Sequence, residues 1–407
     1  MDAHELRSKI FYLSNEVNKF CLSKISKDVI DQPIYNVYNV ISKIFNENLS
    51  NEDIEFLLLI SEVLIDVSWE RLNCGTWKDV PIAWRYLYGY ASFYKAICLM
   101  LQNDNQENRL KSLHCLDLGL IMSPQIGDNL LAKLASFIHK QIFQEKIKHE
   151  KTIVEGGIES KKKKLKTGDD TIERVCGIEL EELKENFLDK KIPVIITDAI
   201  SFWPCLNERK WTLNYLIKNA AYRTVPIEIG SKYTDESWSQ KLMTLEQFIH
   251  DFIIEQNNQI GYLAQHNLFE QIEELRKDFC IPDYCSISKN DNVNVDINAW
   301  FGPSGTVSPL HYDQKDNLLC QVMGSKYIRL YSDETPEEII YPHQSNLLSN
   351  TSQVDVENVD VVKFPLFSQA NYYDCHLHEG ECLFIPKGFW HFVKSLTTSF
   401  SISFWWE

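Results

Sequence analysis

Residues 298–331 read NAWFGPSGTVSPLHYDQKDNLLCQVMGSKYIRLY, and this stretch decides how the chain is interpreted. His311 and Asp313 stand two positions apart near its centre. In a β-strand, residues i and i+2 point to the same face, so the pair would present an imidazole and a carboxylate to one point. A third ligand of suitable type, His391, follows in the motif IPKGFWH. Two histidines and one carboxylate leave coordination positions open, as in non-haem iron sites.

The residues around this pair strengthen the prediction of a metal site, because a His-x-Asp pair alone is common. Lys326 lies on a following apolar segment, where strand alternation places it on one face with Ile328 and Leu330. The opposite face then carries Tyr327, Arg329 and Tyr331. A lysine on a buried face is costly unless an anion neutralises it, and a bound carboxylate would do so. The alternative is that Lys326 extends to water.

Longer motifs give the chain a resemblance to a known family. They are WFGP, SPLHxD, QVMGxKYIRLY, NTSQVDVEN, FIPxxxWH and SFWW, all within residues 175–407. These motifs resemble the jumonji-C family of Fe(II)- and 2-oxoglutarate-dependent oxygenases. Within that family, the similarity is to a branch described both as arginine hydroxylases and as lysine-specific histone demethylases.

The resemblance implies an α+β fold. It predicts a C-terminal double-stranded β-helix, which is a jelly-roll or cupin-like barrel with flanking helices, preceded by an all-α N-terminal domain. The many short segments with Gly and Pro turns in the second half agree with such a double-sheet barrel. We therefore predict a helical interaction domain over residues 1–150, a basic flexible linker over 151–172 and a catalytic domain over 173–407.

The N-terminal half reads as helical. Apolar residues recur with three- and four-residue spacing in residues 52–67, 83–101, 108–122 and 127–145. Paired helices with short breaks predict a bundle or a short solenoid. The tyrosine-rich segment around residues 84–94 is interpreted as core packing, with a binding face as the alternative. We expect this half to dock a protein partner that the sequence does not identify.

A basic cluster, KKKKLK at residues 161–166, lies in the predicted linker. Low hydrophobicity and like charges predict a flexible segment. Such a run is a candidate nuclear-localisation signal, and the alternative is a solvated hinge that no receptor reads. The predicted location is the nucleus, with the cytoplasm as an additional compartment.

Composition limits the partners. The chain has 407 residues with 44% hydrophobic and 24% charged residues, which is typical of a globular protein of two domains. The net charge of −16 disfavours direct nucleic-acid binding and suits a basic protein substrate, such as an arginine-containing segment or a histone tail.

No apolar run is long enough to cross a membrane, and none follows the charged first residues as in a secretory signal. The 11 cysteines lack paired metal spacing and are interpreted as free thiols in a reducing compartment.

The resemblance also implies the cofactors and their contacts. Fe(II) would be held by His311, Asp313 and His391, with 2-oxoglutarate as the cosubstrate and O2 as the oxidant. The implied cosubstrate contacts are Tyr262, Ser308, Asn317 and Lys326. They supply a phenol, a hydroxyl, an amide and an ammonium, which are suitable groups for binding a carboxylate.

Substrate recognition is inferred from the same resemblance. It points to Glu228, Tyr233, Trp238 and Gln265. A carboxylate suits a guanidinium better than a trimethylammonium, whose usual site is an aromatic cage. The leading hypothesis is therefore hydroxylation of arginine side chains. The alternatives are demethylation of N-methyl-lysine by the same metal chemistry, and a non-catalytic scaffold. Glu228 read alone could equally be a surface residue on an edge strand.

A second pair of histidines, His376 and His378, also has i, i+2 spacing. We expect both in the turn before the strand that ends at Pro386, rather than at a second metal.

Overall fold

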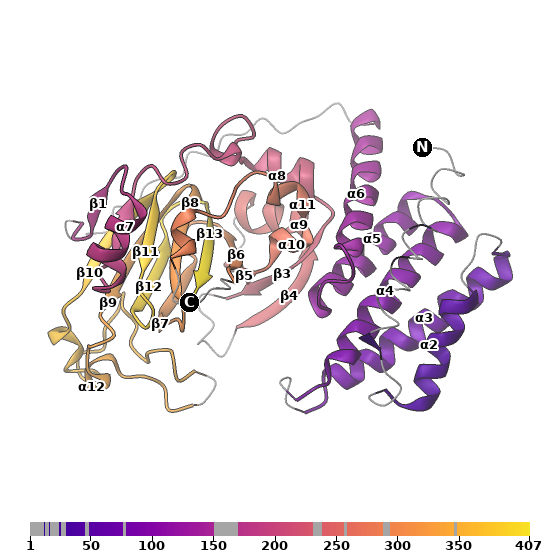
Figure 1. The fold of residues 1–407 in the computed structure, drawn as a ribbon, viewed down its shortest axis with the longest axis horizontal. Coiled ribbons are helices and arrows are strands. Elements are labelled where there is room, and N and C mark those ends of the chain that lie inside the picture. The colour runs from indigo at the N-terminus through magenta and orange to yellow at the C-terminus, as the bar shows by residue number, and fades with distance from the viewer. Residues whose placement is uncertain are drawn as a thin grey trace. The chain divides into compact units, whose positions relative to one another are not determined.

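The computed structural model of the chain describes residues 12, 16, 24, 25, 30–44, 49–75, 79–149, 170–230, 238–255, 259–287, 294–345 and 348–407. It divides into two compact units (Figure 1). The first contains residues 1–152 with 218–224 and 270–274, and the second contains 153–217, 225–269 and 275–407. The domain boundaries proposed from the sequence stay a prediction. Most of the proposed linker, including the basic run at 161–166, lies outside the described residues.

The first unit is built of helices. Its long helices are α2 (Gln32–Ile44), α3 (Asn51–Leu72), α4 (Ile82–Gln102), α5 (Gln106–Met122) and α6 (Leu130–His149). Each packs against the next in chain order, which is the arrangement of a solenoid. At the start of α3, Ser50 and Asp53 form a reciprocal capping box that satisfies free backbone N–H groups.

The tyrosine-rich segment forms the core of this unit. Trp84, Tyr88, Tyr90 and Tyr94 of α4 are all buried. The rings of Tyr90 and Tyr94 lie 4.7 Å apart, and Tyr38 of α2 contacts Tyr90 at the same distance. The interpretation of these aromatics as core packing is confirmed.

A buried ion pair lies within the first unit. The carboxylate of Asp117 on α5 accepts hydrogen bonds from the Arg223 guanidinium at 2.7 and 2.9 Å, and both side chains are fully buried. It also accepts from Gln271 Nε2 at 2.8 Å and from the backbone N–H of Thr224 at 2.7 Å. Such a pair is stable only because the carboxylate is fully hydrogen-bonded.

The second unit contains two sheets. Among the described residues, a nine-stranded sheet has the order β1-β2-β11-β8-β13-β6-β5-β3-β4, and a four-stranded sheet has the order β10-β9-β12-β7. The strands are β1 (Glu173–Val175), β2 (Val194–Ile196), β3 (Thr224–Ile229), β4 (Ser239–Thr244), β5 (Gly261–His266), β6 (Asp296–Gly302), β7 (Val307–Tyr312), β8 (Asp316–Met323), β9 (Ser325–Tyr331), β10 (Tyr373–His378), β11 (Cys382–Ile385), β12 (Trp390–Ser395) and β13 (Ser399–Trp406). Strands distant in sequence alternate within each sheet, as in a jelly-roll barrel. The predicted α+β fold with a barrel after helices is confirmed.

Short helices lie between the strands. They are α7 (Leu180–Leu183), α8 (Leu213–Ala220), α9 (Leu245–Phe248), α10 (Leu268–Gln271), α11 (Glu273–Arg276) and α12 (Glu337–Ile340). Aromatic residues from this region pack against the large sheet. Trp211 meets Phe400 of β13 with ring centroids 4.7 Å apart, and Phe269 meets Phe279 at 4.6 Å.

Strand β9 has the predicted alternation. Ile328 and Leu330 belong to one apolar cluster, whereas Tyr327 and Tyr331 belong to another. A tight turn at Gly324 joins β8 to β9, with φ at +73°. A Cβ atom at Gly324 would overlap the carbonyl oxygen of Thr398, so both the backbone angle and the space require glycine.

The prediction that His376 and His378 lie in a turn is wrong. Both are on β10, where they pair with Tyr327 and Ser325 of β9. Alternation explains the difference, because Cys375 and Leu377 point into the barrel core and continue the strand. The His376 ring is bound to Asp170 at 2.8 Å.

Among the described helices, none combines the length and apolar character that crossing a bilayer requires.

Candidate metal centre and cosubstrate pocket

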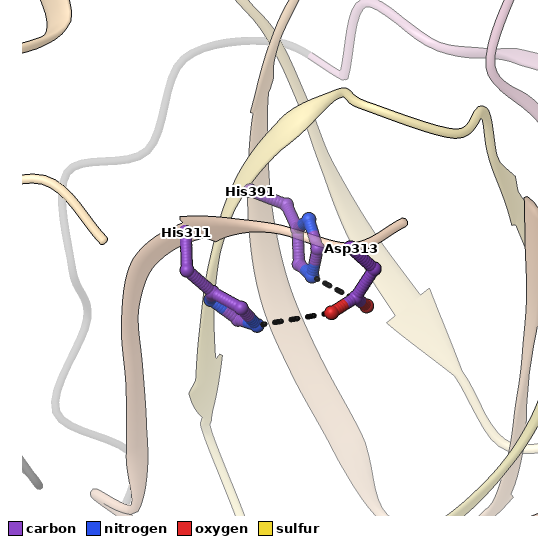
Figure 2. A group of neighbouring side chains, drawn as sticks. All are labelled: His311, Asp313 and His391. Carbon is purple, nitrogen blue, oxygen red and sulfur yellow. Dashed lines mark ion pairs between the residues drawn. The ribbon is translucent and has the colours of Figure 1, made fainter. Parts of the chain in front are cut away.

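Three side chains predicted as metal ligands come together in the barrel (Figure 2). His311 lies near the end of β7, Asp313 follows that strand, and His391 lies on β12. The pairing of β7 with β12 sets His391 directly opposite His311, and their ring centroids are 4.2 Å apart. The three possible ligand atoms lie within 4.8 Å of one another.

Both histidines present Nε2 to the carboxylate. His311 Nε2 lies 4.0 Å from one Asp313 oxygen, and His391 Nε2 lies 3.6 Å from the other. Nδ1 of His311 lies 2.7 Å from the Pro309 carbonyl oxygen, and Nδ1 of His391 lies 3.0 Å from that of Phe389.

A carbonyl oxygen can only accept a hydrogen bond, so each Nδ1 must carry the proton. Each neutral ring then leaves Nε2 with a free lone pair, as a metal ligand requires. Burial, followed by the neighbouring His311, lowers the pKa of His391 to about 4. The His391 ring is therefore neutral at physiological pH.

The three side chains belong to the lining of one cavity in the second unit. The cavity is lined by Tyr262, Trp300, His311, Asp313, Asn317, Leu319, Lys326, Ile385, His391 and Val393. Three of the four side chains predicted to contact the cosubstrate, namely Tyr262, Asn317 and Lys326, are in this lining.

Lys326 is buried in the cavity wall with 1% exposure. Its Nζ donates to Tyr262 Oη at 3.3 Å, and no ion pair to an acidic side chain occurs among the described residues. Burial lowers the pKa of Lys326 to about 7, because the charged form has lost its water. Ser308, the fourth predicted contact, is buried on β7 and hydrogen-bonds to Tyr262.

Asn317 on β8 supplies a second unsatisfied group. Its Oδ1 is buried and has no hydrogen-bond partner among the described residues. Buried amides normally make hydrogen bonds, and rotation of the amide would present its NH2 group instead. An unpaired ammonium and an unsatisfied amide in one cavity fit a small ligand rich in oxygen and negative charge, such as 2-oxoglutarate. The metal-ligand set beside them fits Fe(II).

Unlike the predicted cosubstrate contacts, the predicted substrate residues are not gathered in the lining of the cavity. Glu228 on β3 lies directly opposite Tyr262 of β5, so both side chains share one face of the sheet. Glu228 is half-buried, and burial raises its pKa although the Trp238 indole opposes this. Trp238 lies beside Glu228, yet its Nε1 has no hydrogen bond of normal geometry among the described residues. The indole is therefore a neighbour of the carboxylate and not its hydrogen-bond donor.

Of the other two predicted substrate residues, Gln265 is among the described residues and Tyr233 is not. Gln265 is exposed on β5 and has a left-handed backbone with φ at +46°. It lies where the pairing of β5 with β6 shifts register, as at a β-bulge. Tyr233 lies outside the described residues.

Several residues of the cavity lining were not predicted from the sequence. Trp300 on β6 lines the cavity, and its Nε1 donates to Ser403 Oγ at 2.9 Å. Its place in the WFGP motif was a signal that could have identified it. Leu319, Ile385 and Val393 form apolar walls, and local sequence pattern does not distinguish them from ordinary core residues.

A double-sheet barrel that holds two histidines and one aspartate beside a buried, unpaired lysine defines a class. This is the class of oxygenases that depend on Fe(II) and 2-oxoglutarate. Fe(II) and 2-oxoglutarate are therefore the cofactors.

Comparison with known proteins gives the family. Residues 180–407 match the model of the cupin-like domain, and residues 56–154 match that of the KDM8-like N-terminal ARM repeats. Lysine-specific demethylase 8 of Danio rerio is 44% identical over 362 residues, covering 85% of this chain and 87% of that protein. JmjC domain-containing protein D of Dictyostelium discoideum is 37% identical, covering 97% of this chain and 98% of that protein. Jumonji C domain-containing protein 5 of Drosophila melanogaster is 37% identical, covering 84% and 85%. The chain belongs to the jumonji-C family of cupin-like oxygenases.

Proposed function

We propose that this oxygenase acts on a cationic side chain of basic proteins. The first candidate reaction is removal of methyl groups from N-methyl-lysine. The observation that carries it is similarity over most of the chain to proteins named lysine-specific demethylase, including one 40% identical from Xenopus tropicalis. The net charge of −16 supports a basic substrate, because opposite charge favours encounter.

In this proposal His311, Asp313 and His391 would hold the iron. The carbonyl groups of Pro309 and Phe389 bind Nδ1 of the two rings, which would leave each Nε2 available as a ligand. Bound together, Fe(II) and 2-oxoglutarate supply the activation of O2 that oxidises a substrate C–H bond. The protein's own contribution is to orient these groups and to exclude water from the cavity.

The cosubstrate contacts are proposed from the cavity. Lys326 would pair with the distal carboxylate of 2-oxoglutarate, with Tyr262 as a second donor. Ser308 would orient the Tyr262 hydroxyl, and Asn317 would donate to a cosubstrate oxygen. The apolar wall formed by Leu319 and Ile385 would enclose the carbon chain.

For N-methyl-lysine, the reaction balances without another reactant. One oxygen atom of O2 enters succinate, formed with CO2 from 2-oxoglutarate, and the other enters the methyl C–H bond. The resulting N-hydroxymethyl group breaks at its C–N bond and releases formaldehyde and the amine.

Hydroxylation of arginine is the second candidate, and Glu228 favours it. A half-buried carboxylate beside Tyr262 is a partner for a guanidinium, which offers several N–H donors. A trimethylammonium group offers none. Under this candidate Glu228 would fix the arginine by paired hydrogen bonds.

Mass spectrometry of peptides distinguishes the two candidates. The full chain is incubated with Fe(II), 2-oxoglutarate and ascorbate, together with basic peptides that carry either arginine or mono-, di- or trimethyl-lysine. Loss of methyl groups with formaldehyde supports the first candidate, and a gain of one oxygen on arginine supports the second. His391→Ala is the control in both cases. If succinate forms no faster with the wild type than with this variant, the chain is not an active oxygenase, and the scaffold alternative gains support.

The location and the partner also remain proposals. We propose a nuclear location from the names of the relatives, with the cytoplasm as an additional compartment. The helical unit would dock another protein, since ARM-type repeats present extended surfaces.

A further inference from the structure

Lys326 is enclosed by uncharged neighbours within its own sheet. On β9 it stands opposite Leu377 of β10 and Ser395 of β12. Neither residue can neutralise an ammonium. The side chain therefore has to find its counter-charge in the cavity that it faces.

The cavity side offers one neutral contact. Tyr262 of β5 accepts a hydrogen bond from Lys326 Nζ at 3.3 Å, and the ammonium lies 5.7 Å from the centre of its ring. Burial, opposed by the hydrogen bond from Ser308, raises the pKa of Tyr262, so its hydroxyl keeps its proton. Tyr262 therefore contributes no negative charge.

Two acidic side chains lie near the cavity. Asp313 lies between His311 and His391, at 4.0 and 3.6 Å from their Nε2 atoms. Glu228 of β3 stands opposite Tyr262 of β5. None of the acidic side chains in the described ranges comes within the 4.0 Å ion-pair distance of Lys326.

We propose that Lys326 is a proton acceptor coupled to cosubstrate binding: its amine loses its proton more readily without a dicarboxylate than with one, and it takes up as much as one proton when 2-oxoglutarate binds. This inference rests on the proposed function, because it takes the ligand to be 2-oxoglutarate. The bound distal carboxylate supplies the missing counter-charge, so the ammonium form becomes stable. Burial alone already lowers the pKa of Lys326 to about 7.

The coupling sets how affinity depends on pH. Below pH 7 the lysine is protonated before binding, so the Kd for 2-oxoglutarate is constant. Above pH 7 binding requires proton uptake, and the Kd rises about tenfold for each pH unit. A keto acid without a distal carboxylate, such as 2-oxobutanoate, shows no such rise.

Isothermal titration calorimetry measures the proton directly. 2-Oxoglutarate is titrated into the full chain loaded with Mn(II), in buffers of equal pH but different ionisation enthalpy. The metal keeps its own ligands unprotonated, so they add nothing to the difference between buffers. The expected uptake is about half a proton per site at pH 7 and nearly one at pH 8.

Two controls assign the proton to Lys326. Lys326→Arg keeps a permanent charge, so its uptake should be zero at both pH values. 2-Oxobutanoate on the wild type should also give zero uptake, and this comparison decides the matter if the arginine variant does not fold. Tight binding of 2-oxoglutarate without proton uptake overturns the inference and leaves the proposed function intact. Failure of 2-oxoglutarate to bind the metal-loaded wild type overturns the proposed function instead.

Discussion

Replacing Lys326 with methionine should stabilise the protein in the absence of metal and cosubstrate. The side chains have similar length, so methionine fills the same space without a charge. Lowering the lysine pKa from 10.5 to about 7 corresponds to a cost of roughly 5 kcal/mol, at about 1.4 kcal/mol per pH unit. The variant loses the hydrogen bond to Tyr262, which contributes about 1 kcal/mol. The expected net gain in the free energy of unfolding is therefore a few kcal/mol.

The sign of the pH dependence follows from the two pKa values. Below pH 7 the lysine is protonated in both the folded and unfolded states, so the full cost of burying the charge is present. Between pH 7 and 10.5 the unfolded chain holds a proton that the folded chain lacks, and stability of the wild type rises with pH. The advantage of Lys326→Met should therefore be largest near pH 6 and should shrink by several kcal/mol towards pH 9.

Urea unfolding at pH 6 and pH 9, with EDTA present, measures both quantities. Lys210→Met is the matched control, because Lys210 is half-exposed and its ion pair with Glu379 is screened by solvent. The control variant should change the free energy of unfolding by less than about 0.5 kcal/mol at either pH. If Lys326→Met lowers the stability at both pH values, then Lys326 is not a costly unpaired charge, and the reasoning is refuted.

Three further changes test other parts of the structure. Asp117→Ala should lower the free energy of unfolding by roughly 3–5 kcal/mol, because it leaves Arg223 buried without a partner; the double variant Asp117→Met/Arg223→Met should recover most of this in urea unfolding, and a loss below about 1 kcal/mol would contradict the buried-pair account. Gly324→Ala should lower the Tm clearly more than Gly177→Ala, since both have positive φ but only Gly324 faces a backbone atom, and equal shifts would argue against the overlap. Glu228→Gln should raise the KM for an arginine peptide about tenfold or more and leave the Kd for 2-oxoglutarate unchanged; an altered Kd in calorimetry would move Glu228 to the cosubstrate site.

The stability and the function of the cavity oppose each other. Within the described part of the chain, a buried lysine without a counter-charge and a buried amide oxygen without a hydrogen bond both weaken the fold. Under the proposed function, the same two side chains would bind a dicarboxylate, because no acidic side chain of the described residues competes for the lysine. Functional sites often contain groups that the fold alone would not favour.

The sequence by itself determined the features that depend on near neighbours along the chain. The spacing of His311 and Asp313 placed both on one side of a strand end, and alternation on β9 separated Lys326 from Tyr327. The three- and four-residue periodicity located α3, α4, α5 and α6 of the first unit, whereas α2 was not predicted. These patterns are readable because side-chain direction repeats every two residues in a strand and every 3.6 residues in a helix.

Tertiary structure alone decided the features that depend on which strands pair and in what register. It set His391 opposite His311 and Glu228 opposite Tyr262, although each pair is distant or unmarked in the sequence. It also left Lys326 without an acidic partner among the residues that the structure describes, and no local pattern reveals this. A one-residue change of register would turn each of these side chains to the other face of its sheet, so the pairing of the strands, rather than the residue types, completes the site.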